Sequence, residues 1–259
     1  MIMKKSIRVF LWVGIAALCF VPSAIAQNVS LTSAGGNVYD GVYVSPYYAT
    51  VNGVANTPVV CDDFGDESYL PSSWNASITP FSSISGTNTS WDKENSANIS
   101  LYGAVGYLTG QVLGAPVGSQ TQIIDTFALW AVFDPKGVEG YLAANPINSG
   151  LTTADLCDEI FGGTSGCTTS VASLGSLLYT AENSGLTASA FSNLEVLSPY
   201  VTGTNTICTA EKGNCPAQEF IVVTPEGGAA MAYLLLAGFC CFGAMFGRSR
   251  RQIGSVPAA

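Results

Sequence analysis

An apolar segment at each end of the chain limits how much of it can form a water-soluble fold. The C-terminal segment, residues 229–246, has 18 residues without a charge. As a helix it would be about 27 Å long, which is roughly the thickness of the hydrocarbon core of a bilayer. Three arginines follow it: Arg248, Arg250 and Arg251. Because basic residues beside a membrane segment stay in the cytoplasm, we expect a transmembrane helix at 229–246, a cytoplasmic remainder at 252–259, and all earlier residues outside the cytoplasm.

The N-terminal segment has the three parts of a secretory signal peptide. Its basic residues are Lys4, Lys5 and Arg8. An apolar run over residues 9–21 then leads to Ala24 and Ala26, the small residues of a cleavage site, so that Gln27 becomes the mature N-terminus. We therefore predict a signal peptide at 1–26 and an exported protein. The alternative, a permanent N-terminal membrane helix, is less favoured because a run of 13 residues is short for a span.

Residues 27–224 remain as the secreted domain, which is long enough for one sizeable core. This part holds three lysines and 17 of the 18 acidic residues, and so has a net charge of −14. Such a charge argues against nucleic acid as a partner. The chain has no histidine, which excludes Ser-His and Cys-His catalytic pairs and the commonest zinc ligand. We therefore predict no catalytic residues, no metal site, no cofactor and no enzymatic activity.

The pattern of the secreted domain predicts an α+β fold that is β-rich at both ends and helical in the middle. Residues 38–64 alternate in polarity and are rich in Tyr, Val and Thr, and Asn52-Gly53 marks a hairpin turn between residues 47–51 and 59–61. Further strands are expected within residues 72–90, 194–197 and 219–223. We expect these distant strands to pair in one sheet.

The helices are predicted from apolar residues that recur at three- and four-residue steps. One such pattern covers residues 95–113, and a second covers residues 120–132, after which Asp134-Pro135 should end the helix. Two shorter helices are expected at 154–161 and 173–182.

Five cysteines lie in the secreted domain: Cys61, Cys157, Cys167, Cys208 and Cys215. In an exported domain the close neighbours are the natural disulfide pairs. We therefore predict one bridge between Cys157 and Cys167 and another between Cys208 and Cys215. Cys61 is left outside both pairs, as a buried thiol.

The C-terminal residues 225–251 resemble a known sorting signal. Pro225-Glu226 precedes the apolar segment and the arginine cluster, and this order is similar to the tail of bacterial PEP-CTERM proteins. The resemblance implies an exosortase-type processing enzyme as a partner, an inner-membrane intermediate, and a final location at the cell surface or outside the cell. Gly227 stands where the usual signal has a second proline. An ordinary C-terminal anchor is the alternative.

A second resemblance covers residues 38–134 and the final strand. Its most specific motifs are Cys61-Asp62-Asp63-Phe64 and Phe127-Ala128-Leu129-Trp130, which occur in the same order in secreted PEP-CTERM domains and are similar to those of bacterial surface thioester domains. In thioester domains the matching cysteine is joined to a glutamine four residues before the tryptophan. That position is Thr126 here, which has no carboxamide. Gln122, one helical turn earlier, is the remaining candidate for a thioester with Cys61.

The acidic residues that follow Cys61 allow two interpretations. Four lie close together: Asp62, Asp63, Asp66 and Glu67. Carboxylate oxygens are ligands for calcium, but their spacing does not match a calcium-binding loop of the EF-hand type. We therefore expect an exposed acidic turn.

These patterns lead to a functional hypothesis. We expect an exported, exosortase-sorted cell-surface or extracellular-matrix protein without catalytic activity, whose ligand, if any, is a surface polysaccharide or a protein. The first alternative is a covalent surface adhesin that uses a Cys61 thioester. The second alternative is an exported enzyme, but the sequence contains no credible nucleophile paired with a base.

Overall fold

The structure of the chain is a computed structural model. The structure describes residues 27–35, 38–39, 41–44, 46–65, 68–144, 156–157, 160, 176–209 and 215–224. The predicted signal peptide, sorting tail and transmembrane segment lie outside these residues. Within the described part of the chain, no helix is both long enough and apolar enough to cross a membrane.

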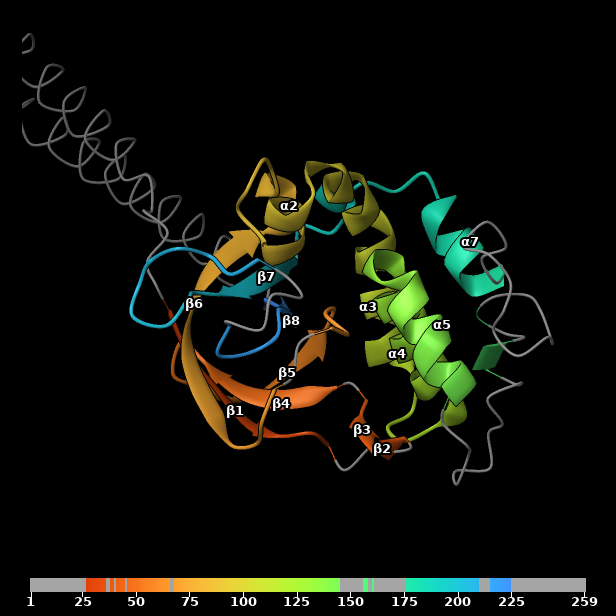
Figure 1. Cartoon of the computed structure of the whole chain (residues 1–259), viewed down its shortest axis with the longest axis horizontal. Helices are drawn as coiled ribbons and strands as arrows, with labels where there is room; N and C mark the ends of the chain where they lie inside the picture. The colour runs from red at the N-terminus through yellow and green to blue at the C-terminus, as the bar shows by residue number, and fades with distance from the viewer. Residues whose placement is uncertain are drawn as a thin grey trace, which may run out of the picture. The chain divides into compact units, whose positions relative to one another are not determined.

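The described residues form a mixed α+β unit, as the sequence predicts, with a closed six-stranded barrel beside a group of helices (Figure 1). The strand order around the barrel is β1-β4-β5-β8-β7-β6. These strands are β1 (Gln27–Ser33), β4 (Tyr47–Val51), β5 (Val54–Cys61), β6 (Ser72–Pro80), β7 (Leu194–Pro199) and β8 (Phe220–Val223). A separate two-stranded sheet pairs β2 (Val38–Tyr39) with β3 (Val42–Tyr43). Closure protects the strand edges that an open sheet would expose.

The predicted hairpin is confirmed as β4 and β5. Asn52 and Gly53 both have positive φ angles, 54° and 79°, as a type I′ turn requires. Val51 pairs with Val54 across this turn, and Tyr47 pairs with Val59 farther along. The sequence placed the second strand at residues 59–61, whereas β5 begins directly after the turn.

The barrel is completed by pairs between strands that are distant in the sequence. β5 pairs antiparallel with β8, so that Cys61 lies opposite Phe220. β6 pairs with β7 on one side and with β1 on the other. This confirms the expected pairing of distant strands. β1 itself was not predicted.

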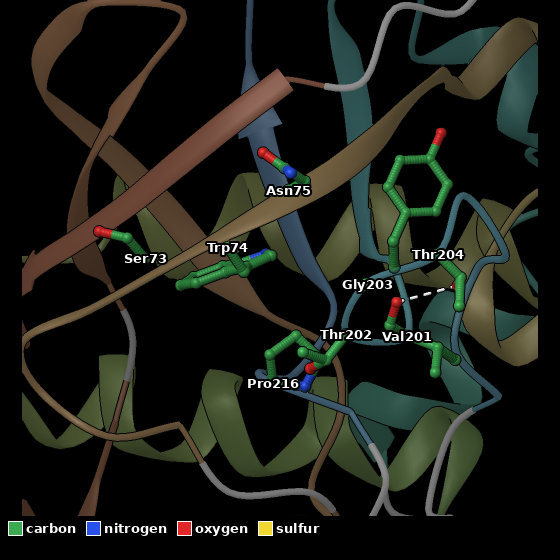
Figure 2. Close-up of a pocket in the computed structure, with 9 residues that line it drawn as sticks. Ser73, Trp74, Asn75, Val201, Thr202, Gly203, Thr204 and Pro216 are labelled. Atoms are coloured by element: carbon green, nitrogen blue, oxygen red, sulfur yellow. Dashed lines mark hydrogen bonds between the residues drawn. The ribbon is translucent and has the colours of Figure 1, made fainter.

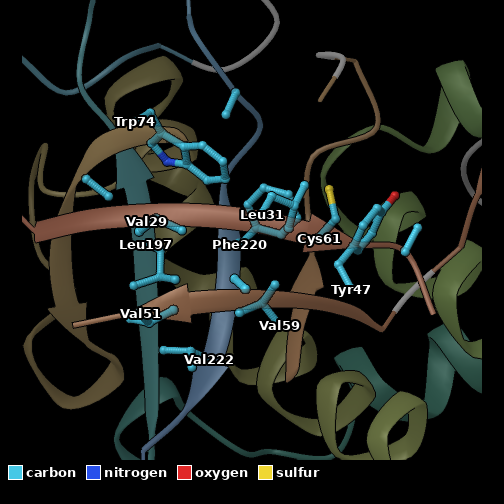
Figure 3. Packing of buried hydrophobic residues seen from close by; sticks show 14 residues of the cluster. Val29, Leu31, Tyr47, Val51, Val59, Cys61, Trp74, Leu197, Phe220 and Val222 are labelled. Atoms are coloured by element: carbon cyan, nitrogen blue, oxygen red, sulfur yellow. The ribbon is translucent and has the colours of Figure 1, made fainter. Parts of the chain in front are cut away.

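The barrel interior is filled by apolar side chains from all six strands (Figure 3). Phe220 lies at its centre, stacked on Trp74 with ring centroids 5.7 Å apart and edge-on to Tyr47 at 5.5 Å. Cys61 belongs to the same cluster and is fully buried. The end of β5 therefore carries a thiol into the core of the domain.

The helical part consists of α2 (Ser90–Glu94), α3 (Tyr102–Gly114), α4 (Gln120–Phe133), α5 (Pro135–Ala144) and α7 (Ser176–Glu182). The 3-10 helices are η1 (Phe81–Ser83), η2 (Ser96–Leu101) and η3 (Ala188–Ala190). The predicted helix at 95–113 divides into η2 and α3, and the one at 120–132 is α4. Of the predicted helix at 154–161, the described residues Leu156, Cys157 and Ile160 are helical.

α5 is a helix that was not predicted, and it begins at the residue pair that was correctly predicted to end the helix before it. The pair Asp134-Pro135 was expected to end the helical pattern, and it does end α4 at Phe133. Pro135 is also the first residue of α5, a position that suits proline because the first turn of a helix needs no N–H from it. The carboxylate of Asp134 accepts a hydrogen bond from Gly137 N at 2.9 Å, which stabilises this new helix start.

Candidate functional site

The candidate site suggested by the sequence is centred on Cys61, the last residue of β5. Its side chain is 0 % exposed, and its Sγ donates a hydrogen bond to the carbonyl of Asp63 at 3.1 Å. Burial raises the pKa of this thiol well above its usual value, and the charge of Asp63 raises it further. Because the thiolate is the nucleophile, a raised pKa disfavours the reactive form of Cys61.

The two specific motifs of the sequence meet at this residue. Trp130 of α4 donates its indole N–H to the carbonyl oxygen of Cys61 at 3.0 Å. Phe64, which ends the first motif, packs against Trp130 and Phe127 of the second, with ring centroids 5.3 and 6.4 Å apart. The motifs therefore form the junction between the barrel and the helices.

Thr126, at the position that matches the glutamine, and Gln122, the remaining candidate for a thioester, both take part in helix contacts. The hydroxyl of Thr126 donates to the carbonyl of Gln122 at 2.8 Å. The Gln122 carboxamide donates to the carbonyl of Val112 at 3.0 Å and accepts from Gly118 N at 2.9 Å. Gln122 thereby ties the end of α3 to the start of α4. To condense with Cys61 it would have to give up both of these bonds.

The two described residues of the acidic turn after Cys61 are buried, contrary to the prediction of an exposed turn. Asp62 is 0 % and Asp63 is 1 % exposed, while Asp66 and Glu67 lie outside the described residues. Asp63 accepts hydrogen bonds from Gly65 N through its carboxylate and from the Gln218 carboxamide through its carbonyl, at 3.0 and 2.7 Å. In the part of the chain that the structure describes, no cluster of three or more potential ligands forms a metal site.

Asp62 faces a second buried acid, Glu219, which the sequence analysis had assigned only to a strand. The carboxylate of Glu219 receives three hydrogen bonds from three different elements: Ser90 N at 2.6 Å, the Ser198 hydroxyl at 2.5 Å and the Tyr102 phenol at 2.8 Å. These donors come from α2, β7 and α3. Glu219 therefore joins the barrel to two helices through one side chain.

The carboxyl groups of Asp62 and Glu219 differ in the number of hydrogen-bond donors around them. Neither side-chain oxygen of Asp62 meets a donor among the described residues. Burial raises its pKa well above the usual value, and the neighbouring charges of Glu219 and Asp63 raise it further. Burial also raises the pKa of Glu219, but its three donors oppose that effect. We therefore assign the negative charge to Glu219 and the proton to Asp62, which can donate it to Glu219.

These contacts hold the barrel strands and the helices together. The thiol, both acids and the Tyr102 phenol are all buried. Burial raises the pKa of Tyr102 as well, and the Glu219 charge adds to this. The sequence signal that could have indicated Glu219, and was not used, is a single acidic residue at the start of an apolar strand.

The remaining predicted residues lie elsewhere in the chain. Cys208 and Cys215 form the predicted disulfide, with Cα atoms 5.8 Å apart. Cys157 is buried and disulfide-bonded, while Cys167, its predicted partner, lies outside the described residues. The same is true of Pro225, Glu226, Gly227, Arg248, Arg250 and Arg251. No family model, curated protein or solved structure matches the chain.

Proposed function

We propose that this chain is an exported cell-surface or extracellular-matrix protein, sorted by an exosortase-type enzyme, and that its folded domain is not catalytic. The proposal is supported by the signal-peptide pattern, by Pro225-Glu226 before an apolar segment and arginines, and by the charge of −14 on residues 27–224. An acidic exterior favours solubility outside the cell.

One observation carries the non-catalytic part of the proposal: the chemistry around Cys61 is inert. The thiol is fully buried, the position that should supply a carboxamide is Thr126, and the Gln122 carboxamide already bonds to Val112 and Gly118. The two motifs that contain Cys61 and Trp130 also have a structural explanation, because these residues contact each other where the barrel meets the helices. On this proposal, Cys61 and the residues around it have a structural role.

A covalent adhesin remains the second candidate, and it has one specific observation in its favour. Trp130 contacts the backbone of Cys61 directly, and Gln122 lies on the same helix as Trp130. A thioester would require the Gln122 carboxamide to leave Val112 and Gly118 and reach Cys61. Its chemical signature is distinct, since the Sγ–C bond forms with loss of ammonia from the glutamine.

The sorting part of the proposal is tested by the mass of the surface form. The full chain is expressed in cells with and without exosortase, beside a variant in which Pro225 and Glu226 are both replaced by alanine. We expect a species that runs from Gln27 to near Pro225 only when both the enzyme and the intact motif are present. Recovery of peptides from residues 231–248 in the surface form would show a permanent anchor instead.

A further inference from the structure

We propose that a polar pocket between β6 and the loop after β7 binds an uncharged polysaccharide, with a sugar ring packed against Tyr200. The pocket has a volume of about 190 Å³ and is lined by residues of both segments, including Trp74, Asn75, Tyr200 and Thr202 (Figure 2). This inference goes beyond the proposed function, since it holds whether or not the tail is cleaved.

The lining carries hydrogen-bonding groups that the described residues leave open. Trp74 is 4 % exposed, yet its indole nitrogen has no acceptor among the described residues. Figure 2 shows the nitrogen-bearing edge of this indole on the side of the loop. Asn75 and Thr202 are exposed at the pocket, which adds an amide and a hydroxyl. A buried donor without an acceptor costs stability unless a water or ligand satisfies it.

Tyr200 lies between two pockets. Its backbone N–H donates to the carbonyl of Asn75 at 3.0 Å, and its half-buried side chain lines both the first pocket and a second one of about 420 Å³. The second pocket also contains Asn205 and Thr206. Two adjacent pockets that share one aromatic ring suit a polymer with a repeating unit better than a single small ligand.

The chemistry of the lining selects a neutral polyol. Among the residues that the structure describes, no charged side chain lines the first pocket, and in the second the Lys93 ammonium donates to the carbonyl of Ile207. Amides and hydroxyls exchange hydrogen bonds with sugar hydroxyls, while the C–H face of a pyranose packs on an aromatic ring. The charge of −14 on residues 27–224 disfavours an anionic polymer.

The barrel argues against an added peptide strand. Peptides often bind by extending an exposed sheet edge, but β6 is paired on both sides, with β1 and with β7. The first pocket is also smaller than the roughly 300 Å³ at which pockets enclose a drug-sized ligand. One sugar ring is the unit that fits it.

The loop is held in place before any ligand arrives. Val201 N donates to the carbonyl of Thr206 at 2.9 Å, and Thr204 N donates to the carbonyl of Val201 at 3.0 Å. Cys208 N bonds to the carbonyl of Pro199 at 2.8 Å, and the Cys208–Cys215 disulfide follows directly. Such pre-organisation lowers the entropy cost of binding.

The test is a calorimetric titration of the full chain, purified from expressing cells in a polyoxyethylene detergent that has no sugar head group. The probes are maltohexaose, cellohexaose and chitohexaose, with polygalacturonate as an anionic probe. We expect at least one neutral hexasaccharide to bind with a Kd of about 1 mM or below. Tyr200→Ala should weaken it about tenfold or more, and Asn75→Ala about threefold or more. Tyr179→Ala, which removes an exposed tyrosine from α7, is the matched control and should leave the Kd unchanged.

Three results would overturn the proposal. The first is that none of the neutral hexasaccharides binds. The second is that polygalacturonate alone binds, which would indicate an electrostatic site. The third is that binding survives both Tyr200→Ala and Asn75→Ala, which would place it elsewhere. Circular dichroism of each variant shows whether it has folded, and the exposed Asn75 position keeps the test decisive if Tyr200→Ala unfolds the loop.

Discussion

The indole N–H of Trp130 donates a hydrogen bond to the carbonyl oxygen of Cys61 at 3.0 Å, across 69 residues of sequence. It joins the last residue of β5 to α4, inside a group of aromatic rings that includes Phe64 and Phe127. The motif residues are therefore needed to dock the helices on the barrel, whether or not the cysteine has a reaction to perform.

Replacing Trp130 by phenylalanine should destabilise the domain. The change leaves the buried carbonyl of Cys61 without its donor and opens a small cavity, which together cost about 2–4 kcal/mol. The free energy of unfolding from urea denaturation measures this loss.

Trp91→Phe is the matched control. Trp91 is 2 % exposed and stacks on Phe133 with centroids 4.8 Å apart, but its indole nitrogen has no acceptor among the described residues. The ring change is the same and no hydrogen bond is lost. A loss for Trp91→Phe as large as that for Trp130→Phe would contradict the role given to the Trp130–Cys61 bond.

Glu219→Gln should be among the most destabilising conservative changes in the domain. The amide keeps the volume of the side chain but presents an N–H₂ group to donors that now bond to a carboxylate, namely Ser90 N, the Ser198 hydroxyl and the Tyr102 phenol. We expect a loss of about 2–4 kcal/mol. Tyr102→Phe, which removes one donor, should cost about 1–2 kcal/mol. Equal stability of Glu219→Gln and the original protein in urea denaturation would refute the junction described for Glu219.

Asp62 should make the domain less stable as the pH rises. Its pKa in the folded state is raised by burial and by the charges of Glu219 and Asp63, whereas the unfolded value is about 3.9. Between these two values the folded state binds more protons than the unfolded state, so that stability falls as the pH increases above about 4. Glu219, whose pKa is also raised, contributes in the same direction.

The substitution Asp62→Asn tests this dependence. Asparagine stays neutral and can donate to Glu219, so that the free energy of unfolding should fall less steeply between pH 4 and pH 8. A gain of at least about 1 kcal/mol at pH 8 is expected, since one pKa unit corresponds to about 1.4 kcal/mol. Glu94→Gln removes an exposed negative charge and serves as the control. If both variants show the same slope as the original protein, Asp62 does not hold the proton assigned to it.

The parts of the fold that depend on local chemistry could be predicted from the sequence. Asn52-Gly53 specifies a turn with two positive φ angles, and the apolar period of residues 120–132 specifies α4. Barrel closure was beyond such reasoning, because the β5–β8 pairing joins residues about 160 apart and leaves no local signal. β1 was missed because its first residues directly follow the predicted cleavage site.

The candidate site was predicted only in part for the same reason. The motifs that contain Cys61 and Trp130 were recognised, and the structure brings them together. Asp62 was assigned to an exposed turn because a run of acids normally faces solvent. Its burial depends on Glu219, and on the donors from α2, α3 and β7 that allow Glu219 to be charged there. Composition near Asp62 carries no information about partners so far along the chain.

The pairing of Cys157 with Cys167 remains a prediction that peptide mapping can test. Cys157 is buried and disulfide-bonded, and a loop of this length should contribute about 2–3 kcal/mol by restricting the unfolded chain. Digestion of the exported protein without reduction should release one peptide pair with these two cysteines. A bridge from Cys61 to any other cysteine would contradict both the pairing and the buried thiol.

The central claim, that Cys61 is a structural thiol and not an acyl donor, is tested most directly by intact mass. The full chain recovered from expressing cells is incubated with methylamine, beside Cys61→Ala and Gln122→Glu variants. We predict no mass deficit of ammonia in the untreated protein, no methylamine adduct, and a thiol that reacts with iodoacetamide only after denaturation, because Cys61 is fully buried and its pKa is raised. A deficit of one ammonia, with an adduct that disappears in both variants, would contradict this account and identify a covalent adhesin.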